Sequence, residues 1–326
     1  MGGLDHTIAV KAVRCAVESE RTAVEKRCRK EFRALQRLQH ANIVKLIGVV
    51  TDNPESVWLL MELAPRSLRS LLKNDPNKVV GVLSTQRQLM RGIAAGMAFL
   101  HDQKPRPILH HDLKTDNVLV WPEKASFLPK LTDFGLATGT GNSTTKTKFV
   151  GAGTQAYKAP ECYRNNTFTP ASEIYAYGIV GHEVLTGKIP WEEMNDENIM
   201  CKVLIDKERP PFPSDLGSSS ILVPLIQRCW AEDQSNRPSF KEVIEADELA
   251  IPELFAFLSH TQRDANAKVI AEGLYSGFNE FQQERCWLDV KMTKKDVTAM
   301  EAGVKDSQAF IAVVTDNGAG IGLVRE

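Results

Sequence analysis

A block of polar residues suited to phosphoryl transfer lies between two short apolar runs, in the stretch ILHHDLKTDNVLV at residues 108–120. The block contains Asp112, Lys114 and Asn117, and a second acid, Asp133, follows in the run LTDFG. Short apolar runs predict buried strands, so these polar side chains are expected in the loops next to the strands. Two carboxylates and an amide on neighbouring loops could hold a divalent cation and orient a hydroxyl group, which phosphoryl transfer requires.

This arrangement resembles the catalytic core of eukaryotic protein kinases, in which an HxDLxxxN motif is followed by DFG. Here the motifs are HHDLKTDN from His110 and DFG from Asp133, and APE follows at residues 159–161. The resemblance implies the α+β two-lobed protein kinase fold, with a small β-rich N-lobe and a large helical C-lobe. It also implies ATP and Mg²⁺ as cofactors and a protein hydroxyl as the phosphate acceptor.

The resemblance implies a role for each matching residue of these two loops. Asp112 would accept or orient the proton of the substrate hydroxyl, and Lys114 would neutralise the transferring phosphate. Asn117 and Asp133 would bind Mg²⁺, a cation that prefers oxygen ligands. The alternative is an ordinary polar turn between two strands.

Two further features of the same loops are expected. By resemblance, His110 and Phe134 stack with Leu35 in a packed column that links the lobes. Asp116 matches no residue with an assigned role and is expected to be solvated.

A lysine and a glutamate upstream complete the constellation that the resemblance implies. Thr7–Val13 (TIAVKAV) predicts a strand whose alternation places Lys11 beside small apolar residues. Residues 18–39 predict an amphipathic helix with Glu31 on its buried stripe. In kinases such a pair holds the lysine against the α- and β-phosphates, so we expect Lys11 and Glu31 to pair. The alternatives are a surface lysine on an edge strand and a solvated rim carboxylate.

The adenine of ATP is expected at a hinge between the lobes. Val57–Leu63 (VWLLMEL) predicts a buried strand that leads into the hinge. By resemblance, Met61 is the gatekeeper, and the backbone of Glu62 and Ala64 binds the adenine edge. We expect three parts of a kinase domain at residues 1–249, namely the N-lobe at 1–61, the hinge at 62–66 and the C-lobe at 67–249.

The C-lobe is expected to be largely helical. Leu68–Leu100 carries apolar residues at helical spacing, including Ile93 and Met97, and predicts core helix. Ser172–Trp191 predicts a second hydrophobic helix. By resemblance, Glu161 of the APE motif pairs with Arg237 and ties the preceding segment to the C-lobe.

The pattern of kinase motifs also indicates the substrate. Lys114 in LKxxN and Thr154 in GTQAYKAPE resemble serine/threonine kinases, and the CW and RPSF motifs resemble the tyrosine-kinase-like group. We therefore expect a serine/threonine kinase that acts in intracellular signalling. The stretch between DFG and APE would be the activation segment, with hypothetical phosphorylation sites at Ser143, Thr144, Thr145 and Thr147.

A second unit is expected at residues 254–326. Three strand-like runs (LFAFLS from Leu254, CWLDV from Cys286 and FIAVVT from Phe310) alternate with helical patterns, which predicts a parallel sheet. FLSH, WLDV and FIAVVT resemble a flavodoxin-like TIR domain, here a partial one. TIR domains either assemble with one another or cleave NAD with a glutamate on a helix after the third strand. Glu301 does not match that position, so self-association or binding of a TIR partner is expected.

Three departures from the kinase pattern bear on activity. Lys11 lies ten residues after Met1, too close for the two strands and Gly-rich loop that precede this lysine in kinases. We therefore expect an N-lobe without its first strands and an interior piece of a longer protein. His111 replaces the usual arginine of HRD, so control by phosphorylation is expected to be weak or pH-dependent. Glu173 replaces the aspartate of the helix that braces the catalytic loop.

The bulk composition excludes several other classes. A formal net charge of −1 argues against nucleic acid or membrane binding through bulk charge, and no apolar run approaches the roughly 18 residues of a membrane span. The six cysteines show no CxxC pair, which favours a reduced, cytoplasmic setting. Two alternatives to the kinase function stay open, a catalytically weak kinase-like scaffold and a NAD-cleaving TIR enzyme.

Overall fold

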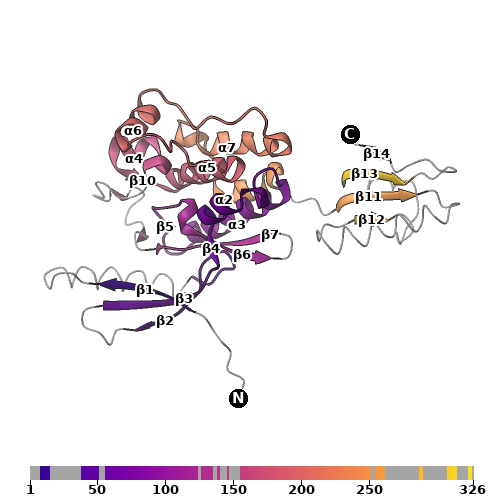
Figure 1. The fold of residues 1–326 in the computed structure, drawn as a ribbon. Coiled ribbons are helices and arrows are strands. Elements are labelled where there is room, and N and C mark those ends of the chain that lie inside the picture. Colours follow the sequence, from indigo (N-terminus) through magenta and orange to yellow (C-terminus); the bar gives the residue numbers. More distant parts are fainter. Residues whose placement is uncertain are drawn as a thin grey trace, which may run out of the picture. The chain divides into compact units, whose positions relative to one another are not determined.

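The computed structural model describes residues 8–14, 38–50, 56–123, 126–134, 138–139, 145–146, 155–250, 254–260, 286–288, 307–313 and 322–324. The chain divides into two compact units (Figure 1), one formed by residues 1–122 and 126–249 and the other by 123–125 and 250–326. No helix within the described ranges is long and apolar enough to cross a membrane.

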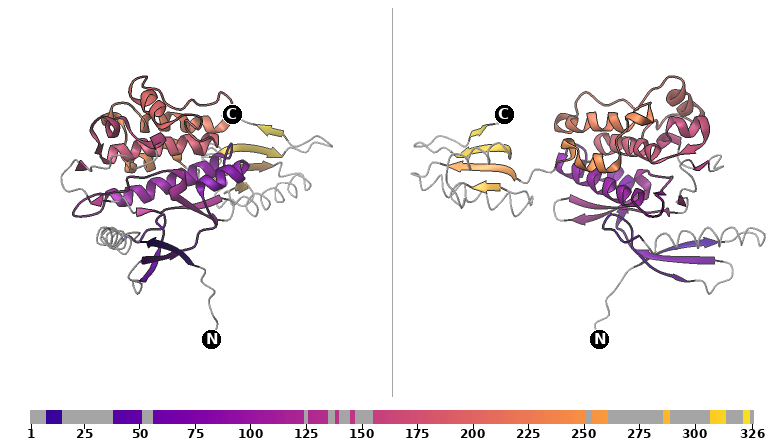
Figure 2. Two further views of the ribbon diagram at one scale, coloured as in Figure 1. Left: turned by 60° about the vertical axis from the view of Figure 1, so that its left-hand side comes forward. Right: turned by 180° about the vertical axis from the view of Figure 1, so that it is seen from behind.

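A three-stranded antiparallel sheet forms one end of the first unit (Figures 1 and 2), in the order β1 (Ile8–Arg14), β3 (Ser56–Glu62), β2 (Leu46–Val50). Lys11 lies opposite Leu59 and Ala9 opposite Met61. Directly opposed residues share a face, so the register confirms that Ala9 and Lys11 point to the same side. The predicted bounds of β1 (Thr7–Val13) and β3 (Val57–Leu63) each differ from the observed ones by one residue.

Helices make up most of the rest of the first unit. Their bounds are α2 (Leu68–Asn74), α3 (Leu83–His101), α4 (Pro160–Asn165), α5 (Pro170–Thr186), α6 (Asp196–Leu204), α7 (Val223–Cys229) and α8 (Phe240–Glu245). The first unit also contains short 3₁₀ turns at η1 (Pro76–Lys78), η2 (Thr115–Asn117), η4 (Gln155–Tyr157), η5 (Gly217–Leu222), η6 (Gln234–Asn236) and η7 (Asp247–Leu249).

The predicted helical stretch Leu68–Leu100 is interrupted. Pro76 opens η1 and Gly81 adopts a left-handed backbone (φ 79°), so α2 and α3 are separate helices. Within α3, Ile93, Met97 and Leu100 are at most 1% exposed, which confirms them as core.

The ends of α5 are set by local sequence. The Thr169 side chain accepts a hydrogen bond from Ser172 N–H, and the Ser172 hydroxyl oxygen accepts one from Thr169 N–H, which together form a capping box that starts the helix. Gly187 ends it in a left-handed conformation (φ 68°). The predicted helix Ser172–Trp191 was therefore wrong at its C-terminal end.

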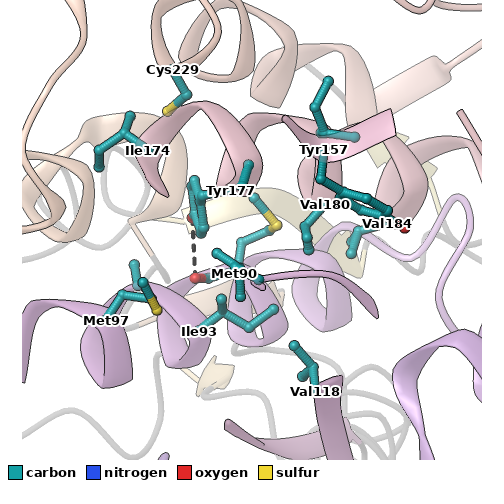
Figure 3. Close-up of a cluster of buried hydrophobic side chains, with 14 of the residues drawn as sticks. Met90, Ile93, Met97, Val118, Tyr157, Ile174, Tyr177, Val180, Val184 and Cys229 are labelled. Atoms are coloured by element: carbon teal, nitrogen blue, oxygen red, sulfur yellow. Dashed lines mark hydrogen bonds between the residues drawn. The ribbon is translucent and has the colours of Figure 1, made fainter. Parts of the chain in front are cut away.

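The core of the first unit lies where α3 packs against α5 (Figure 3). The hydroxyl of Tyr177 in α5 donates to the carbonyl of Met90 in α3 at 3.1 Å, so the buried phenol keeps a partner. On its other side α3 packs closely on the chain at Asn42. A Cβ added at Gly96 would lie 2.8 Å from the Asn42 carbonyl oxygen, so only glycine allows this approach.

Short strands carry the loops of interest. They are β4 (Arg66–Ser67), β5 (Ile108–Leu109), β6 (Val118–Glu123), β7 (Ser126–Leu131), β8 (Thr138–Gly139), β9 (Thr145–Lys146) and β10 (Thr167–Phe168). They pair as a β4-β6-β7 sheet and as the two ribbons β5-β8 and β10-β9. The apolar runs at Ile108–Leu109 and Val118–Val120 thus form strands, as predicted.

The described residues of the second unit form a sheet in the order β12 (Cys286–Leu288), β11 (Leu254–His260), β13 (Ser307–Val313), β14 (Gly322–Val324). β11 pairs in parallel with both β12 and β13, which confirms the predicted parallel pairing of the three strands. β14 pairs antiparallel with β13 and was not predicted. The helices predicted between these strands, with Glu301, lie outside the described residues.

Candidate active site

Asp112 lies at the centre of the loop between β5 and β6. The Asn117 amide nitrogen donates to the Asp112 carbonyl at 2.8 Å and to its carboxylate Oδ2 at 2.9 Å. The Lys114 ammonium lies 2.9 Å from the same Oδ2. Three of the predicted residues therefore lie together, and Asp112 keeps one carboxylate oxygen outside these contacts.

Asp133 lies close to this loop and contacts Lys11. The Thr132 N–H donates to the Asn117 carbonyl at 3.0 Å, which joins the two loops. The Lys11 ammonium lies 2.9 Å from Asp133 Oδ1, and both side chains are partly exposed, at 34% and 47%. The fold thus brings β1 to the chain segment that follows β7.

The donor set of these two loops fits Mg²⁺. The Asn117 amide nitrogen donates to Asp112, so its Oδ1 could serve as an oxygen ligand. Mg²⁺ commonly takes one or two protein oxygens and completes its shell with water and phosphate. Asn117 and Asp133 would supply these oxygens.

Buried side chains fix the backbone on both sides of Asp112. His110 is fully buried, its Nε2 lies 2.9 Å from the Thr132 carbonyl, and its ring contacts Phe134 at 5.1 Å between centroids. The predicted contact of His110 with Phe134 is confirmed, and Leu35 lies outside the described residues. His111 and Asp133 adopt left-handed backbone (φ 69° and 64°), which costs a non-glycine residue about 1–2 kcal/mol.

Glu173 of α5 supports the loop that carries Asp112 through a hydrogen bond to its backbone. Its buried carboxylate accepts a hydrogen bond from His111 N at 2.6 Å and lies 2.7 Å from His101 Nε2. Burial alone would raise the pKa of Glu173, but the hydrogen bond and charge of His101, with the nearby His111 and His110, lower it below its ordinary value. The residue noted as a departure from the kinase pattern occupies the bracing position.

A buried polar network behind the loop was not predicted. Glu183 is fully buried in α5 and binds Arg69 at 2.7 Å, Thr115 Oγ1 at 3.0 Å and the Tyr157 hydroxyl. Burial raises the pKa of Glu183 to about 7 against the opposing effect of Arg69. The sequence signal was a glutamate in the apolar run IVGHEVL.

Arg69 extends this network to the surface of the loop. Its Nε lies 3.4 Å from Asp116 Oδ2, and the Asp116 side chain is 51% exposed. Asp116 is therefore half-solvated, as expected, but it has a cationic partner that the sequence did not indicate.

Arg237 anchors the start of α4. Its guanidinium donates to both carboxylate oxygens of Glu161, at 2.7 and 3.0 Å, which confirms the predicted pair.

Upstream, Thr138 pairs with Leu109 and Thr145 with Phe168 in short antiparallel ribbons. The suggested phosphorylation sites other than Thr145 lie outside the described residues, namely Ser143, Thr144 and Thr147.

The predicted hinge follows β3. Met61 is partly buried opposite Ala9, and the Glu62 carboxylate accepts the Lys45 N–H at 2.7 Å and pairs with Lys130 at 2.8 Å. These contacts of the Glu62 side chain were not foreseen, because the prediction concerned only its backbone. The roles of Met61, Glu62 and Ala64 toward adenine stay predictions.

Some predicted features lie outside the described residues. They are Glu31, the proposed partner of Lys11, and residues 1–7, which precede β1.

Comparison with known proteins agrees with this geometry. The sequence matches the family model described as "Protein kinase domain" over residues 4–247. Mitogen-activated protein kinase kinase kinase 10 of Mus musculus is 32% identical over 246 residues, which cover 73% of this chain and 25% of that protein. Dual specificity protein kinase shkD of Dictyostelium discoideum is 32% identical over 269 residues (82% and 34%), and shkC of the same organism is 34% identical over 220 (67% and 42%).

The chain spans less than half the length of these curated relatives. The family match itself covers most of the first unit and includes Lys11, Asp112, Asn117 and Asp133. The chain therefore belongs to the protein kinase domain family.

Proposed function

We propose that this protein is a serine/threonine kinase that transfers the γ-phosphate of Mg-ATP to a protein hydroxyl. One observation carries the proposal: Asp112 is held by Asn117 and Lys114, while Asp133 on the adjoining loop lies 2.9 Å from Lys11. Asp112 is the proposed proton acceptor, and Lys11 and Lys114 supply two cations. Asn117 and Asp133 are the proposed metal ligands.

Each of these residues has a role in the proposed reaction. Asp112 orients the substrate hydroxyl and accepts its proton, and Lys114 neutralises charge on the transferring phosphate. Asn117 and Asp133 would hold Mg²⁺, which when bound offsets the negative charge of the phosphates. Lys11, already beside Asp133, binds the α- and β-phosphates, with Glu31 as its proposed partner.

The adenine would bind at the hinge after β3. Met61 shares a face of the sheet with Ala9 and Lys11, so the gatekeeper and the phosphate-binding lysine lie on one side of it. The backbone of Glu62 and Ala64 would then bind the adenine edge. The kinase domain is proposed to span residues 1–249.

We also propose that residues 254–326 form a partial TIR domain that mediates assembly. The support is the FLSH, WLDV and FIAVVT motifs together with the parallel pairing of β11 with β12 and β13. The partners would be a second copy of this domain or another TIR domain.

The test is Mg-ATP-dependent phosphate incorporation into a generic serine/threonine substrate by the wild type, Lys11→Ala and Asp112→Asn. Removal of a group used only in the transition state is expected to lower kcat/KM by at least about a hundredfold. Asp116→Asn is the matched control, since it makes the same chemical change four residues away and is expected to retain most activity.

The outcomes separate the candidate functions. Equal, background-level phosphorylation by the wild type and both variants would favour a kinase-like scaffold. Loss of NAD in a parallel assay would instead support a NAD-cleaving TIR enzyme. Phosphotyrosine as the main product would contradict the proposed serine/threonine specificity.

A further inference from the structure

A pocket borders Asp112 on the side of the chain that leads into α4. Its lining includes Asp112, Tyr157, Lys158, Phe168 and Glu173. If Asp112 orients the acceptor hydroxyl, we expect the residues next to that acceptor to lie near this pocket. The charges of its walls then decide which neighbours are favoured.

Lys158 is held in the pocket wall by an aromatic ring. Its ammonium lies 4.9 Å from the centre of the Tyr163 ring, and the Tyr163 hydroxyl donates to the Gln155 carbonyl at 2.6 Å. A ring anchored at its hydroxyl keeps the cation in place through a cation–π contact. No carboxylate among the described residues forms an ion pair with Lys158.

The acids near Lys158 already have cationic or hydrogen-bonding partners. Asp112 contacts Lys114 and Asn117, and Glu173 contacts His101 and the His111 N–H. Glu161, three residues after Lys158, is bound by both terminal nitrogens of Arg237. Lys158 is therefore a positioned cation that could pair with an anionic ligand.

The sequence before Lys158 has the same sign of charge. Residues 135–160 contain three lysines and no aspartate or glutamate. One of them, Lys146, follows Thr145, and Thr145 lies opposite the pocket residue Phe168 in the β9–β10 ribbon. The sequence between DFG and APE thus carries charges of positive sign only, which favours an acidic ligand.

We propose that Lys158 is a specificity-determining residue that selects substrates with an acidic or phosphorylated side chain within two residues of the acceptor hydroxyl. This inference rests on the proposed kinase function. A carboxylate and a phosphate share the chemistry that Lys158 recognises, namely a compact anion that can accept from an ammonium group.

The test uses peptides that differ only next to the acceptor serine, with aspartate, phosphoserine, alanine or lysine there. For the wild type, kcat/KM is expected to be about tenfold higher for an anionic peptide than for the alanine peptide, mainly through KM. The aspartate and phosphoserine arms show which anion is preferred. Lys158→Met should abolish the preference, so that kcat/KM becomes similar for the anionic and the alanine peptides.

Charge reversal supplies the decisive variant. Lys158→Glu is expected to favour the lysine peptide over the aspartate peptide, which a merely structural role of Lys158 would not produce. Lys241→Met is the control, because Lys241 is exposed and pairs with Asp102 in a different part of the unit. Wild-type enzyme that phosphorylates all peptides equally, or a Lys158→Glu variant that still prefers aspartate, would overturn the inference.

Direct binding of the same peptides separates this inference from the proposed function. A titration by fluorescence anisotropy requires no phosphoryl transfer. Suppose that anionic peptides bind more tightly, that Lys158→Glu reverses this preference and that no phosphorylation is detected. This result would support the charge selection by Lys158 and contradict the proposed kinase function. Binding without charge preference would refute the role of Lys158 whatever the enzyme activity.

Discussion

Arg237 binds both carboxylate oxygens of Glu161, and its side chain is fully buried. A bidentate pair of this kind fixes the orientation of both groups. The pair joins the start of α4 to the turn before α8, two parts of the chain 76 residues apart. Its loss would leave a charge without a partner inside the protein.

Arg237→Ala is therefore expected to lower the free energy of unfolding by about 3–5 kcal/mol, the usual cost of breaking a buried ion pair. Urea denaturation of the wild type and the variant measures this. Arg228→Ala is the matched control, because Arg228 forms an equally short pair with Glu248 but is 49% exposed. The control should lose about 1 kcal/mol or less of its free energy of unfolding. Equal losses in the two variants would contradict the expectation that the buried pair contributes more to stability than the exposed one.

Glu173→Asp is expected to slow phosphoryl transfer even though aspartate is the usual kinase residue. The shorter side chain cannot hold both the His111 N–H and the His101 ring, so the loop that carries Asp112 loses one of its supports. We expect kcat to fall about tenfold with little change in KM, since orientation rather than binding is lost. Steady-state kinetics with varied ATP and peptide tests this.

Glu173→Gln distinguishes length from charge. Glutamine keeps the length and an oxygen that accepts from His111, so it should retain more activity than aspartate. A glutamine variant that is less active than the aspartate variant would show that the carboxylate charge, not the reach, is what the loop needs.

The pKa of Glu183 predicts a pH dependence of stability. Its pKa is raised from 4.5 to about 7 by burial. Between these values the folded protein keeps the proton and the unfolded chain has lost it, so the contribution of Glu183 to stability falls as the pH rises from about 4.5 to 7. Over that range the change is on the order of 3 kcal/mol.

Glu183→Gln removes this contribution. Relative to the wild type, the variant should gain stability as the pH rises from 5 to about 7, as measured by urea denaturation at several pH values. His182 has a lowered pKa through burial and acts in the opposite sense, but it is present in both proteins and cancels in the difference. A constant difference across this range would mean that Glu183 stays ionised beside Arg69.

Asn117→Ala is expected to raise the Mg²⁺ concentration required for half-maximal activity by about tenfold, because one of two proposed protein ligands is lost. A Mg²⁺ titration at fixed ATP measures this. Asp116→Asn, on the same loop and half-exposed, should leave the Mg²⁺ requirement unchanged. An unchanged requirement in Asn117→Ala would remove Asn117 from the metal site.

The grouping of Asp112, Lys114 and Asn117 could be predicted because the residue types and their order carry the information. Apolar runs at Ile108–Leu109 and Val118–Val120 predicted strands, and the observed loop between them brings Asp112, Lys114 and Asn117 together. The pair Glu161–Arg237 was predictable only through the resemblance, because nothing local in either sequence segment indicates the other.

Contacts that depend on three-dimensional packing were missed. Arg69 and Glu183 are 114 residues apart, as their numbering shows, and neither lies in a recognisable motif. The periodicity of α5 does not indicate a buried ionisable group, since a polar residue on a helix is by default assigned to its exposed face. The end of α5 was misplaced because the apolar run continues past Gly187, whereas the left-handed backbone there stops the helix.

The left-handed backbone of His111 and Asp133 has a consequence for how this protein could change under selection. Both positions carry conformational strain that glycine would relieve, and asparagine to a lesser degree. Selection for heat resistance alone would therefore move positions 111 and 133 toward those residues. Selection for turnover is expected to oppose this at position 133, where the carboxylate is a proposed Mg²⁺ ligand. Variants recovered after directed evolution for thermostability should thus accumulate in this pair of loops at the expense of rate.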